Sequence, residues 1–264
     1  MKQNLIRKWY NKLSFPEKYN EEFEHLIEST PISAESIENW DYKAKTPEEN
    51  VLAYLYFCEA LEKKYEALGI PEKILLDTLS DLVIWTNTHY KLTGKFGLSE
   101  TGWLYRHLSF KLFRLGRLQF CMADSEFGIE EIGLRAGAPV VEVHIPEGEP
   151  LPLSICKESL AYADDFFAKY FPDFNYFTYT CHSWLLDPSI IPLVGEESNI
   201  AAFRGMFKIV QNDDSDALFK YIFRWNATRE DIKDIEAKSS LAKKVKAAAL
   251  LGERFHESLG YILK

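Results

Sequence analysis

The sequence lacks long apolar runs and an excess of basic residues. No stretch approaches the 18 consecutive apolar residues typical of a membrane-spanning helix, and the start, MKQNLIRKWY, has no apolar run of signal-peptide length. Its 31 Lys and Arg stand against 40 Asp and Glu, so the net charge is -9, the wrong sign for general affinity for nucleic-acid phosphates or anionic lipids. We therefore expect a cytoplasmic protein that binds neither nucleic acid nor a membrane surface.

Cysteine is scarce and widely spaced. The four cysteines, Cys58, Cys121, Cys156 and Cys181, form no C-x-x-C pair and no short Cys/His ladder. Neither a zinc site nor a dithiol redox site is indicated. In a cytoplasmic protein we expect these thiols to be reduced and mostly buried.

What remains is the composition of an ordinary globular protein with many aromatic residues. Of the 264 residues, 47% are hydrophobic and 14% are aromatic. At about 150 residues per domain, the length fits one large domain or two small ones. Composition leaves open whether the aromatic residues fill a core or line a ligand cleft.

Helical patterns occupy the first part of the chain, which we interpret as a helical N-terminal domain over residues 1–110. Thr46-Pro47-Glu48-Glu49 is a capping box, with proline at the first helical position. The helix that it opens should end at Gly69, and a second helix should run from Pro71 to Gly94. Shorter helices are predicted over residues 2–12, 16–28 and 33–43.

From about residue 111 the pattern changes to short β-branched or aromatic runs between turn residues. A C-terminal domain over residues 111–264 is therefore expected, and with it an α+β fold. A helix of residues 154–170 should join two parallel strands by a crossover connection. The predicted strands cover residues 110–122, 129–134, 139–145, 175–184 and 205–211.

Polar residues alternate with apolar ones in the run PVVEVHIP. Since residues two apart share one face of a strand, Glu142 and His144 should lie together, opposite Val141 and Val143. A carboxylate beside an imidazole is a common arrangement for a general base. An exposed or helix-covered polar face is the alternative.

The run YFTYTCHSW contains the adjacent pair Cys181-His182. In a regular strand the two side chains point to opposite faces, so a cysteine nucleophile with this base would need a bulge or a strand end. His182 instead shares a face with Thr180 and Trp184. If this strand lies parallel beside the one carrying His144, the polar faces converge on one pocket, where Glu142, His144 and His182 could also form a metal triad.

Other polar residues allow a structural and a functional interpretation. Arg117 and Gln119 place a cation and an amide in a strand otherwise rich in apolar residues, either as a salt bridge or as contacts for a substrate carboxylate or phosphate. Asp187, followed by proline, is expected to cap a helix. The lysines of KSSLAKKVK indicate a solvated face, with phosphate capture as the alternative.

The strings RLGRLQF, VHIPEGEPL and CHSWLLDP, behind a helical N-terminal region, resemble bacterial acyltransferase-domain proteins. These join an N-acyltransferase-type helical N-terminal domain to a GNAT-like C-terminal domain, and the resemblance covers nearly the whole chain. It implies a GNAT-like sheet, with acyl-CoA as cosubstrate between two splayed parallel strands and an amine that attacks the thioester directly. It also implies a base for the amine proton and backbone N–H groups that polarise the thioester carbonyl.

The chain departs from the family pattern at the phosphate-binding loop. Typical GNAT proteins carry Q/R-x-x-G-x-G/A, whose N–H groups hold the pyrophosphate of CoA at a helix start. Here the loop reads PEGEPLPLS, with Gly148 as its single glycine between Glu147 and Glu149. Two carboxylates there would repel pyrophosphate, so no residue is assigned to cofactor binding.

The leading hypothesis is a GNAT-like N-acyltransferase that acts on a small or peptide amine. His144 or His182 would be the base, with Glu142 orienting the imidazole. Arg117 and Gln119, with Thr180 and Trp184, would hold the acceptor. The alternative is a non-catalytic ligand- or partner-binding module of GNAT-like shape that has lost pyrophosphate recognition, and a hydrolase that uses Cys181 is a third option.

Overall fold

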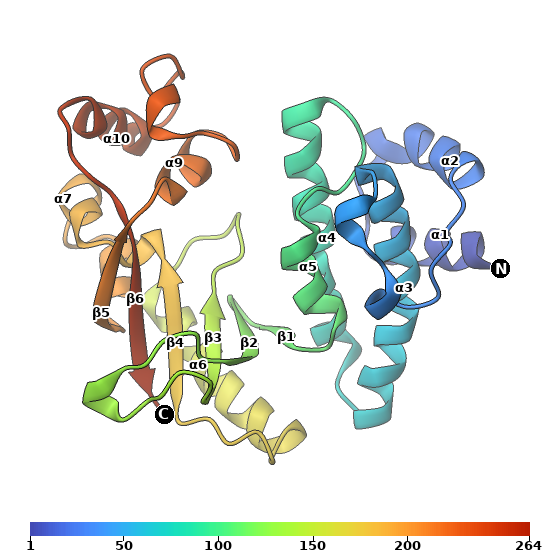
Figure 1. The fold of residues 1–264 in the computed structure, drawn as a ribbon, viewed down its shortest axis with the longest axis horizontal. Helices are drawn as coiled ribbons and strands as arrows, with labels where there is room; N and C mark the ends of the chain where they lie inside the picture. The colour runs from blue at the N-terminus through green and yellow to red at the C-terminus, as the bar shows by residue number, and fades with distance from the viewer. The chain divides into compact units, whose positions relative to one another are not determined.

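The computed structural model describes all 264 residues, which divide into two compact units, Met1–Leu115 and Gly116–Lys264. The first unit is helical except for one short strand at its end (Figure 1). Its elements are α1 (Lys2–Lys12), α2 (Asn20–Ser29), α3 (Pro47–Leu68), α4 (Glu72–Thr93), α5 (Thr101–Leu108) and β1 (Leu112–Leu115). No helix of the chain has the length and hydropathy that crossing a membrane requires.

The predicted caps of the two long helices are present. Thr46 Oγ1 accepts from the Glu49 N–H at 3.2 Å, and Glu49 Oε2 accepts from the Thr46 N–H at 3.0 Å, so the capping box opens α3 as expected. Gly69 and Gly94 end α3 and α4 with φ values of 65° and 74°, a region that glycine adopts without steric cost. Aromatic side chains fill much of this unit's core, including Trp9, Tyr19 and Tyr54.

The predicted helix over residues 33–43 is wrong. Two short 3-10 turns, Ile37–Asn39 and Tyr42–Ala44, stand there instead. The side chains of Ser36, Asn39 and Asp41 bond to nearby backbone N–H groups, which holds these turns and competes with a continuous helix. Helix α5 is present although no helix was predicted there.

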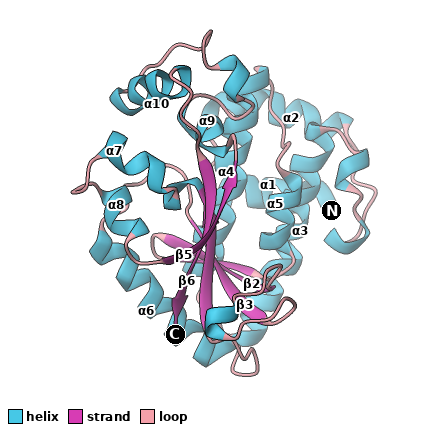
Figure 2. Cartoon of the chain, turned by 60° about the vertical axis from the view of Figure 1, so that its left-hand side comes forward, coloured by secondary structure: helices cyan, strands magenta, loops and turns pink.

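The second unit is built on a mixed sheet with helices around it, so the α+β fold is confirmed (Figure 2). Within this unit the strand order is β2-β3-β4-β6-β5, and only the β3–β4 pair is parallel. The strands are β2 (Leu118–Asp124), β3 (Pro139–His144), β4 (Thr178–Ser183), β5 (Lys208–Asp214) and β6 (His256–Leu263). The helices are α6 (Leu153–Tyr170), α7 (Ile191–Val194), α8 (Asn199–Arg204), α9 (Ala217–Ile222) and α10 (Ser240–Leu250).

The two faces of the sheet differ in polarity. One face carries Phe120 and Tyr179, whose rings lie 5.9 Å apart, and the Tyr179 hydroxyl donates to Asp164 of α6 at 2.8 Å. On the opposite face, Ile129 and Leu134 of the β2–β3 connection pack against Val140 and Tyr261 at one end. The rest of that face carries the polar residues of the candidate site.

Two strand predictions need correction, and one strand was not predicted. The strand predicted for residues 129–134 is a 3-10 turn, Glu130–Ile132, whose ends are joined by an isolated bridge between Ile129 and Leu134. The strand predicted for residues 110–122 is interrupted at Gly116, where φ is 75°. β6 was missed because Gly260 interrupts its apolar pattern, although glycine is required there: an added Cβ would lie 2.9 Å from Phe207 Cβ.

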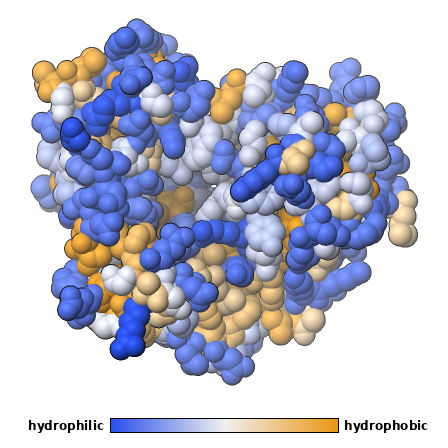
Figure 3. Space-filling model, in the orientation of Figure 1, coloured by the Kyte–Doolittle hydropathy of each residue, from blue (hydrophilic) through white to orange (hydrophobic).

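The surface seen in Figure 3 is mainly hydrophilic, in keeping with the many charged residues. Exposed large apolar side chains of the second unit include Val210 on β5 and Leu263 on β6.

Candidate active site

Glu142 and His144 form a carboxylate–imidazole pair on β3. Both side chains lie on one face because they are two residues apart, while Val141 and Val143 point to the other and are buried. His144 Nε2 lies 3.3 Å from Glu142 Oε2. The two side chains are 27% and 24% exposed, so a substrate can reach them. The carboxylate can orient the imidazole and stabilise its protonated form.

The strands that carry this polar face separate at their carboxyl ends. The parallel ladder between β3 and β4 has only two residue pairs, Val141–Tyr179 and Glu142–Thr180. Beyond it, β3 continues to His144 paired with β2, and β4 continues to Ser183 paired with β6. The backbone edges of β3 and β4 that follow Glu142 and Thr180 therefore form no ladder with each other.

Gln119 of β2 completes this end of the site. It is directly opposite His144 in the antiparallel β2–β3 pair, so its side chain lies on the same face. The residue is 1% exposed, and its Nε2 has no hydrogen-bond partner. An unpaired buried donor costs about 1–3 kcal/mol, so its position beside His144 favours a ligand as the missing acceptor.

Thr180 and His182 extend the polar face onto β4. Thr180 is buried and pairs with Glu142 in the ladder. His182 Nε2 lies 3.5 Å from Asp213 Oδ2 of β5, and its ring meets Phe127 edge-on at a centroid distance of 5.9 Å. The structure therefore gives each histidine its own carboxylate. No three His, Cys, Asp or Glu side chains of the chain form a group that could hold a metal ion, so Glu142, His144 and His182 do not form a triad.

Asp213 was not among the residues expected from the sequence to form the site. Its signal was the run QNDD, which the predicted strand of residues 205–211 excluded by ending too early. β5 continues to Asp214, and Gln211 donates its amide N–H to both carboxylate oxygens of Asp213 at 2.9 Å. Extending the alternation by two residues would have placed Gln211 and Asp213 on one face.

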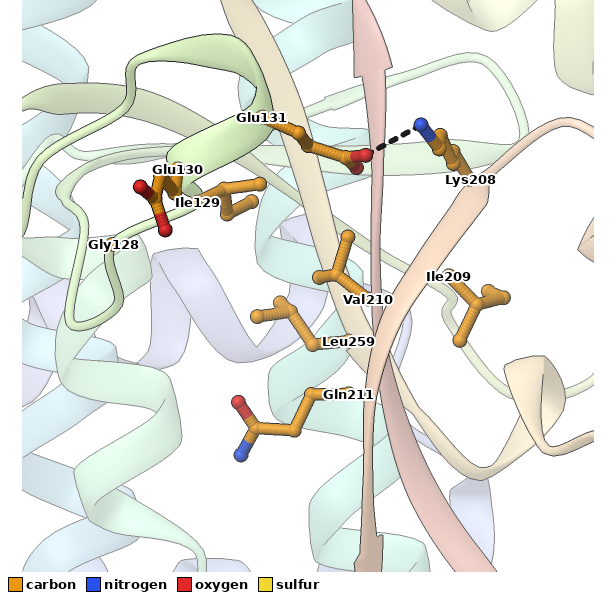
Figure 4. Close-up of a pocket in the computed structure, with 9 residues that line it drawn as sticks. All are labelled: Gly128, Ile129, Glu130, Glu131, Lys208, Ile209, Val210, Gln211 and Leu259. Atoms are coloured by element: carbon orange, nitrogen blue, oxygen red, sulfur yellow. Dashed lines mark hydrogen bonds and ion pairs between the residues drawn. The ribbon is translucent and has the colours of Figure 1, made fainter.

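A pocket of about 400 Å³ lies on the same face of the sheet, between the β2–β3 connection and β5 (Figure 4). Leu259, which pairs with His182 across β4 and β6, lines it. An ion pair of 2.5 Å between Glu131 and Lys208 joins the two walls, and Figure 4 shows Ile129 on one wall and Val210 on the other. The full lining is Gly128, Ile129, Glu130, Glu131, Lys208, Ile209, Val210, Gln211 and Leu259.

Arg117 contacts the loop that follows β3. Its Nε donates to the Pro150 carbonyl oxygen at 2.9 Å and its Nη2 to the Glu149 carbonyl oxygen at 2.5 Å. The residue is 5% exposed. Arg117 was expected either to form a salt bridge or to hold the acceptor, and in the structure its guanidinium donates to these backbone carbonyls.

Trp184 lies beyond the end of β4, which stops at Ser183, in a 3-10 turn. Its ring stacks on Tyr221 of α9 with a centroid distance of 6.0 Å. It also packs against an apolar cluster that includes Ile190, Leu218 and Phe255. The regular strand assumed for residues 175–184 would have placed Trp184 beside Thr180 and His182; the observed turn places it with α9.

Cys181 and Asp187 are both buried, and their environments favour structural roles. Cys181 is 1% exposed on the face opposite His182, and burial raises the pKa of its thiol, which disfavours the nucleophilic thiolate. Asp187 is fully buried and caps the turn Pro188–Ile190 by accepting from the Ser189 N–H at 2.9 Å. It also accepts from the His256 N–H at 2.7 Å.

The lysines of α10 bond mostly to nearby carbonyls. Lys244 donates to the Leu193 carbonyl oxygen at 2.8 Å, and Lys246 donates to those of Lys233 and Ile235 at 2.9 and 2.7 Å. These contacts favour a structural interpretation of this basic stretch.

Several solved structures share this fold. A crystal structure of an acyltransferase in complex with decanoyl-CoA is 26% identical, covering 98% of this chain and 88% of that one with a TM-score of 0.78. An acyltransferase in complex with decanoyl-CoA and teicoplanin is 24% identical, with coverage of 98% and 87% and a TM-score of 0.78. None of the curated proteins compared with this chain matches it.

Family models match both parts of the chain. Residues 4–110 match the N-acyltransferase N-terminal domain, and residues 112–262, more than half of the chain, match the GNAT-like C-terminal domain. The resemblance inferred from RLGRLQF, VHIPEGEPL and CHSWLLDP is thereby confirmed. The chain belongs to the family of proteins that combine an N-acyltransferase N-terminal domain with a GNAT-like C-terminal domain.

Proposed function

We propose that this protein transfers an acyl group from acyl-CoA to an amine of a small molecule or peptide. The observation that carries the proposal is the early end of the β3–β4 ladder beside the Glu142–His144 pair. In this proposal the thioester lies between the strand ends that follow the ladder, and the pair supplies a base beside it. Relatives of the same fold bind decanoyl-CoA, and one of them also binds teicoplanin, which supports both the donor class and a small-molecule or peptide-type acceptor.

In the proposed reaction the acceptor nitrogen attacks the thioester carbonyl carbon. A C–N bond forms, the C–S bond breaks, and the sulfur leaves as CoA thiolate. His144 Nε2–H donates to Glu142, so the other ring nitrogen, Nδ1, accepts the proton that the acceptor nitrogen loses, and Glu142 stabilises the resulting imidazolium. Gln119 Nε2 donates to the acceptor or to the thioester oxygen, which satisfies its free N–H.

The acceptor enters, in this proposal, from the side of the 400 Å³ pocket. The Glu130 carboxylate is exposed there, and Asp213 lies beside His182 at 3.5 Å. Lys208 already pairs with Glu131, so the groups left to a ligand are acidic and suit a cationic amine. Thr180 lies beside Glu142 on this face, and His182 with Asp213 can take the extra proton of an incoming ammonium.

Calorimetry with acetyl-, octanoyl- and decanoyl-CoA tests the donor. We expect binding heat with at least one of them, and no heat and no thermal shift with any would refute the proposal. Release of CoA thiol in the presence of an amine tests transfer. We expect His144→Ala to lower kcat by about 100-fold, because a positioned general base contributes about 10²–10⁴-fold. His182→Ala is the matched comparison, since its histidine has its own carboxylate; a loss confined to His182→Ala would move the base to β4.

A second candidate function is a binding module without catalysis. The exposed Glu147 and the prolines at positions 146, 150 and 152 favour it, since they remove donors and add negative charge where CoA phosphates are expected. This candidate predicts that the protein binds a ligand but releases no CoA thiol from acyl-CoA, whichever amine is added.

A further inference from the structure

The loop between β3 and α6 has one glycine where GNAT proteins use several, yet it has a partner that fixes its shape. We propose that Arg117 is a positioning residue that holds residues 146–152 in the form that binds the diphosphate of acyl-CoA. The inference rests on the proposed function, since it concerns how that cosubstrate is held.

Arg117 joins three elements at the start of β2. Its guanidinium donates to the Glu149 and Pro150 carbonyl oxygens at 2.5 and 2.9 Å. The backbone N–H of Arg117 donates to Ser159 Oγ of α6 at 2.8 Å. Gly116 lets the chain reach this position, because a Cβ there would lie 2.8 Å from Ser159 Oγ. Loop, strand and helix thus meet at one buried residue, whose side chain holds the loop and whose backbone N–H holds the helix.

The two hydrogen bonds from the Arg117 guanidinium, called the Arg117 clamp below, orient the peptide groups of the loop. In a trans peptide the C=O and N–H point in opposite directions, so the Leu151 N–H points away from Arg117 when the Pro150 carbonyl points toward it. The next N–H groups, of Leu153, Ser154 and Ile155, belong to the first turn of α6 and have no earlier turn to bond to. Pro152 caps the helix without a side-chain bond, which leaves these donors to a ligand.

The charge of Arg117 also reaches the start of α6. Burial raises the pKa of the Cys156 thiol in that first turn, and the Arg117 charge acts in the opposite direction. A fixed cation beneath the loop offsets the repulsion between a diphosphate and the exposed Glu147 and Glu149. Arg117 therefore fixes the conformation of this loop by hydrogen bonds, whereas glycine-rich loops reach theirs through the torsion angles that glycine allows.

A comparison of two acyl donors tests this role. Decanoyl-CoA carries the diphosphate, and decanoyl-pantetheine presents the same thioester without it. The test variant is Arg117→Lys, since a lysine cannot hold two carbonyls with a planar fork. We expect its Kd for decanoyl-CoA to rise at least about 10-fold, while kcat/KM with decanoyl-pantetheine stays within about threefold of wild type. Equal losses with both donors, or no loss with either, would overturn the inference.

A second variant leaves the clamp in place. Glu147→Gln removes one exposed carboxylate of the loop, and Glu196→Gln removes one from the exposed α7–α8 connection as a matched control. At low salt we expect Glu147→Gln to bind decanoyl-CoA about two- to threefold more tightly, with the gain lost at 1 M salt. Equal affinity of the two variants would contradict a diphosphate at this loop.

The two proposals fail differently. If wild-type protein uses both donors but Arg117→Lys affects decanoyl-CoA and decanoyl-pantetheine equally, only the proposed role of Arg117 is refuted. If wild-type protein uses and binds neither donor, the acyltransferase function falls, and the role of Arg117 falls with it.

Discussion

His144 Nε2 lies 3.3 Å from Glu142 Oε2, and the parallel ladder between β3 and β4 ends at Glu142 itself. At His144, β3 is therefore no longer paired with β4, but it is still paired with β2 on its other side. The pairing with β2 holds the imidazole in place beside a strand edge that has no ladder partner, which is where we propose that the substrate binds. Its chemistry depends on the charge of Glu142.

Replacing Glu142 by Gln keeps the size of the side chain and removes that charge. We expect kcat for acyl transfer to fall by about 10-fold or more, because the imidazolium formed in the reaction loses its counter-charge. The KM for acyl-CoA should stay unchanged. Steady-state kinetics checks this, with Glu236→Gln, an exposed site remote in sequence, as the control. An unchanged kcat would remove Glu142 from the mechanism.

Gln119→Leu should separate stability from activity. The free Nε2 makes the amide costly in the unliganded protein, so an apolar side chain of similar size should raise the free energy of unfolding by about 1 kcal/mol. Activity should fall, because the donor to the substrate is lost. Denaturant unfolding together with kcat/KM measures both.

Thr178→Val serves as the comparison for Gln119→Leu. Thr178 is also fully buried, but its hydroxyl donates to the Ile262 carbonyl oxygen at 3.0 Å. Its removal should cost about 1 kcal/mol. If Gln119→Leu destabilises as much as Thr178→Val does, the amide has a partner in solution and the argument for a ligand there fails.

Gly260→Ala should destabilise the sheet of the second unit. A Cβ at this position would lie 2.9 Å from Phe207 Cβ, 3.0 Å from Ile209 Cδ1 and 3.2 Å from Leu186 Cδ1, so side chains on two segments must move. Overpacking of this kind costs about 1–3 kcal/mol. Thermal unfolding measures the loss.

Gly205→Ala is the matched control for Gly260→Ala. Its Cβ would approach only the Ala201 and Ala202 carbonyl oxygens, both at 3.4 Å. We expect its Tm to stay close to that of wild type. A Tm for Gly260→Ala equal to that of Gly205→Ala would show that the core around β6 yields more easily than its contacts indicate.

Cys181 should resist alkylation in the folded protein. The thiol is buried and burial raises its pKa, so little thiolate forms at pH 7.5 and the reagent cannot reach it. Mass spectrometry after iodoacetamide treatment should find Cys181 unlabelled without denaturant and labelled with it. Rapid labelling that abolishes activity would restore the hydrolase hypothesis.

Local signals in the sequence were reliable where the structure depends on near neighbours. The capping box at Thr46, the terminating Gly69 and Gly94, and the Asp187 cap all involve bonds or torsions within a few residues. The alternation of Glu142 and His144 was equally local, because β geometry alone puts them on one face. The wrong predictions also had local causes. Gly260 interrupts the apolar pattern of β6, so that strand was not predicted, and polar side chains around Ser36 form turns where a helix was predicted.

The pairing of groups across strands was beyond the sequence. Nothing in the spacing of His182 and Asp213 along the chain indicates that they meet, and nothing in RLGRLQF shows that Arg117 reaches the carbonyls of Glu149 and Pro150. Such partners depend on strand order and register, which arise from packing of the whole sheet.

By itself, the sequence determined the family, the α+β class and the polar face of β3, because motif strings and side-chain alternation are properties of the chain. Only the tertiary structure decided which carboxylate serves which histidine, where β3 and β4 part, and what Arg117 holds. The physical reason is that register and strand separation bring together residues that are distant along the chain, and no local preference specifies them.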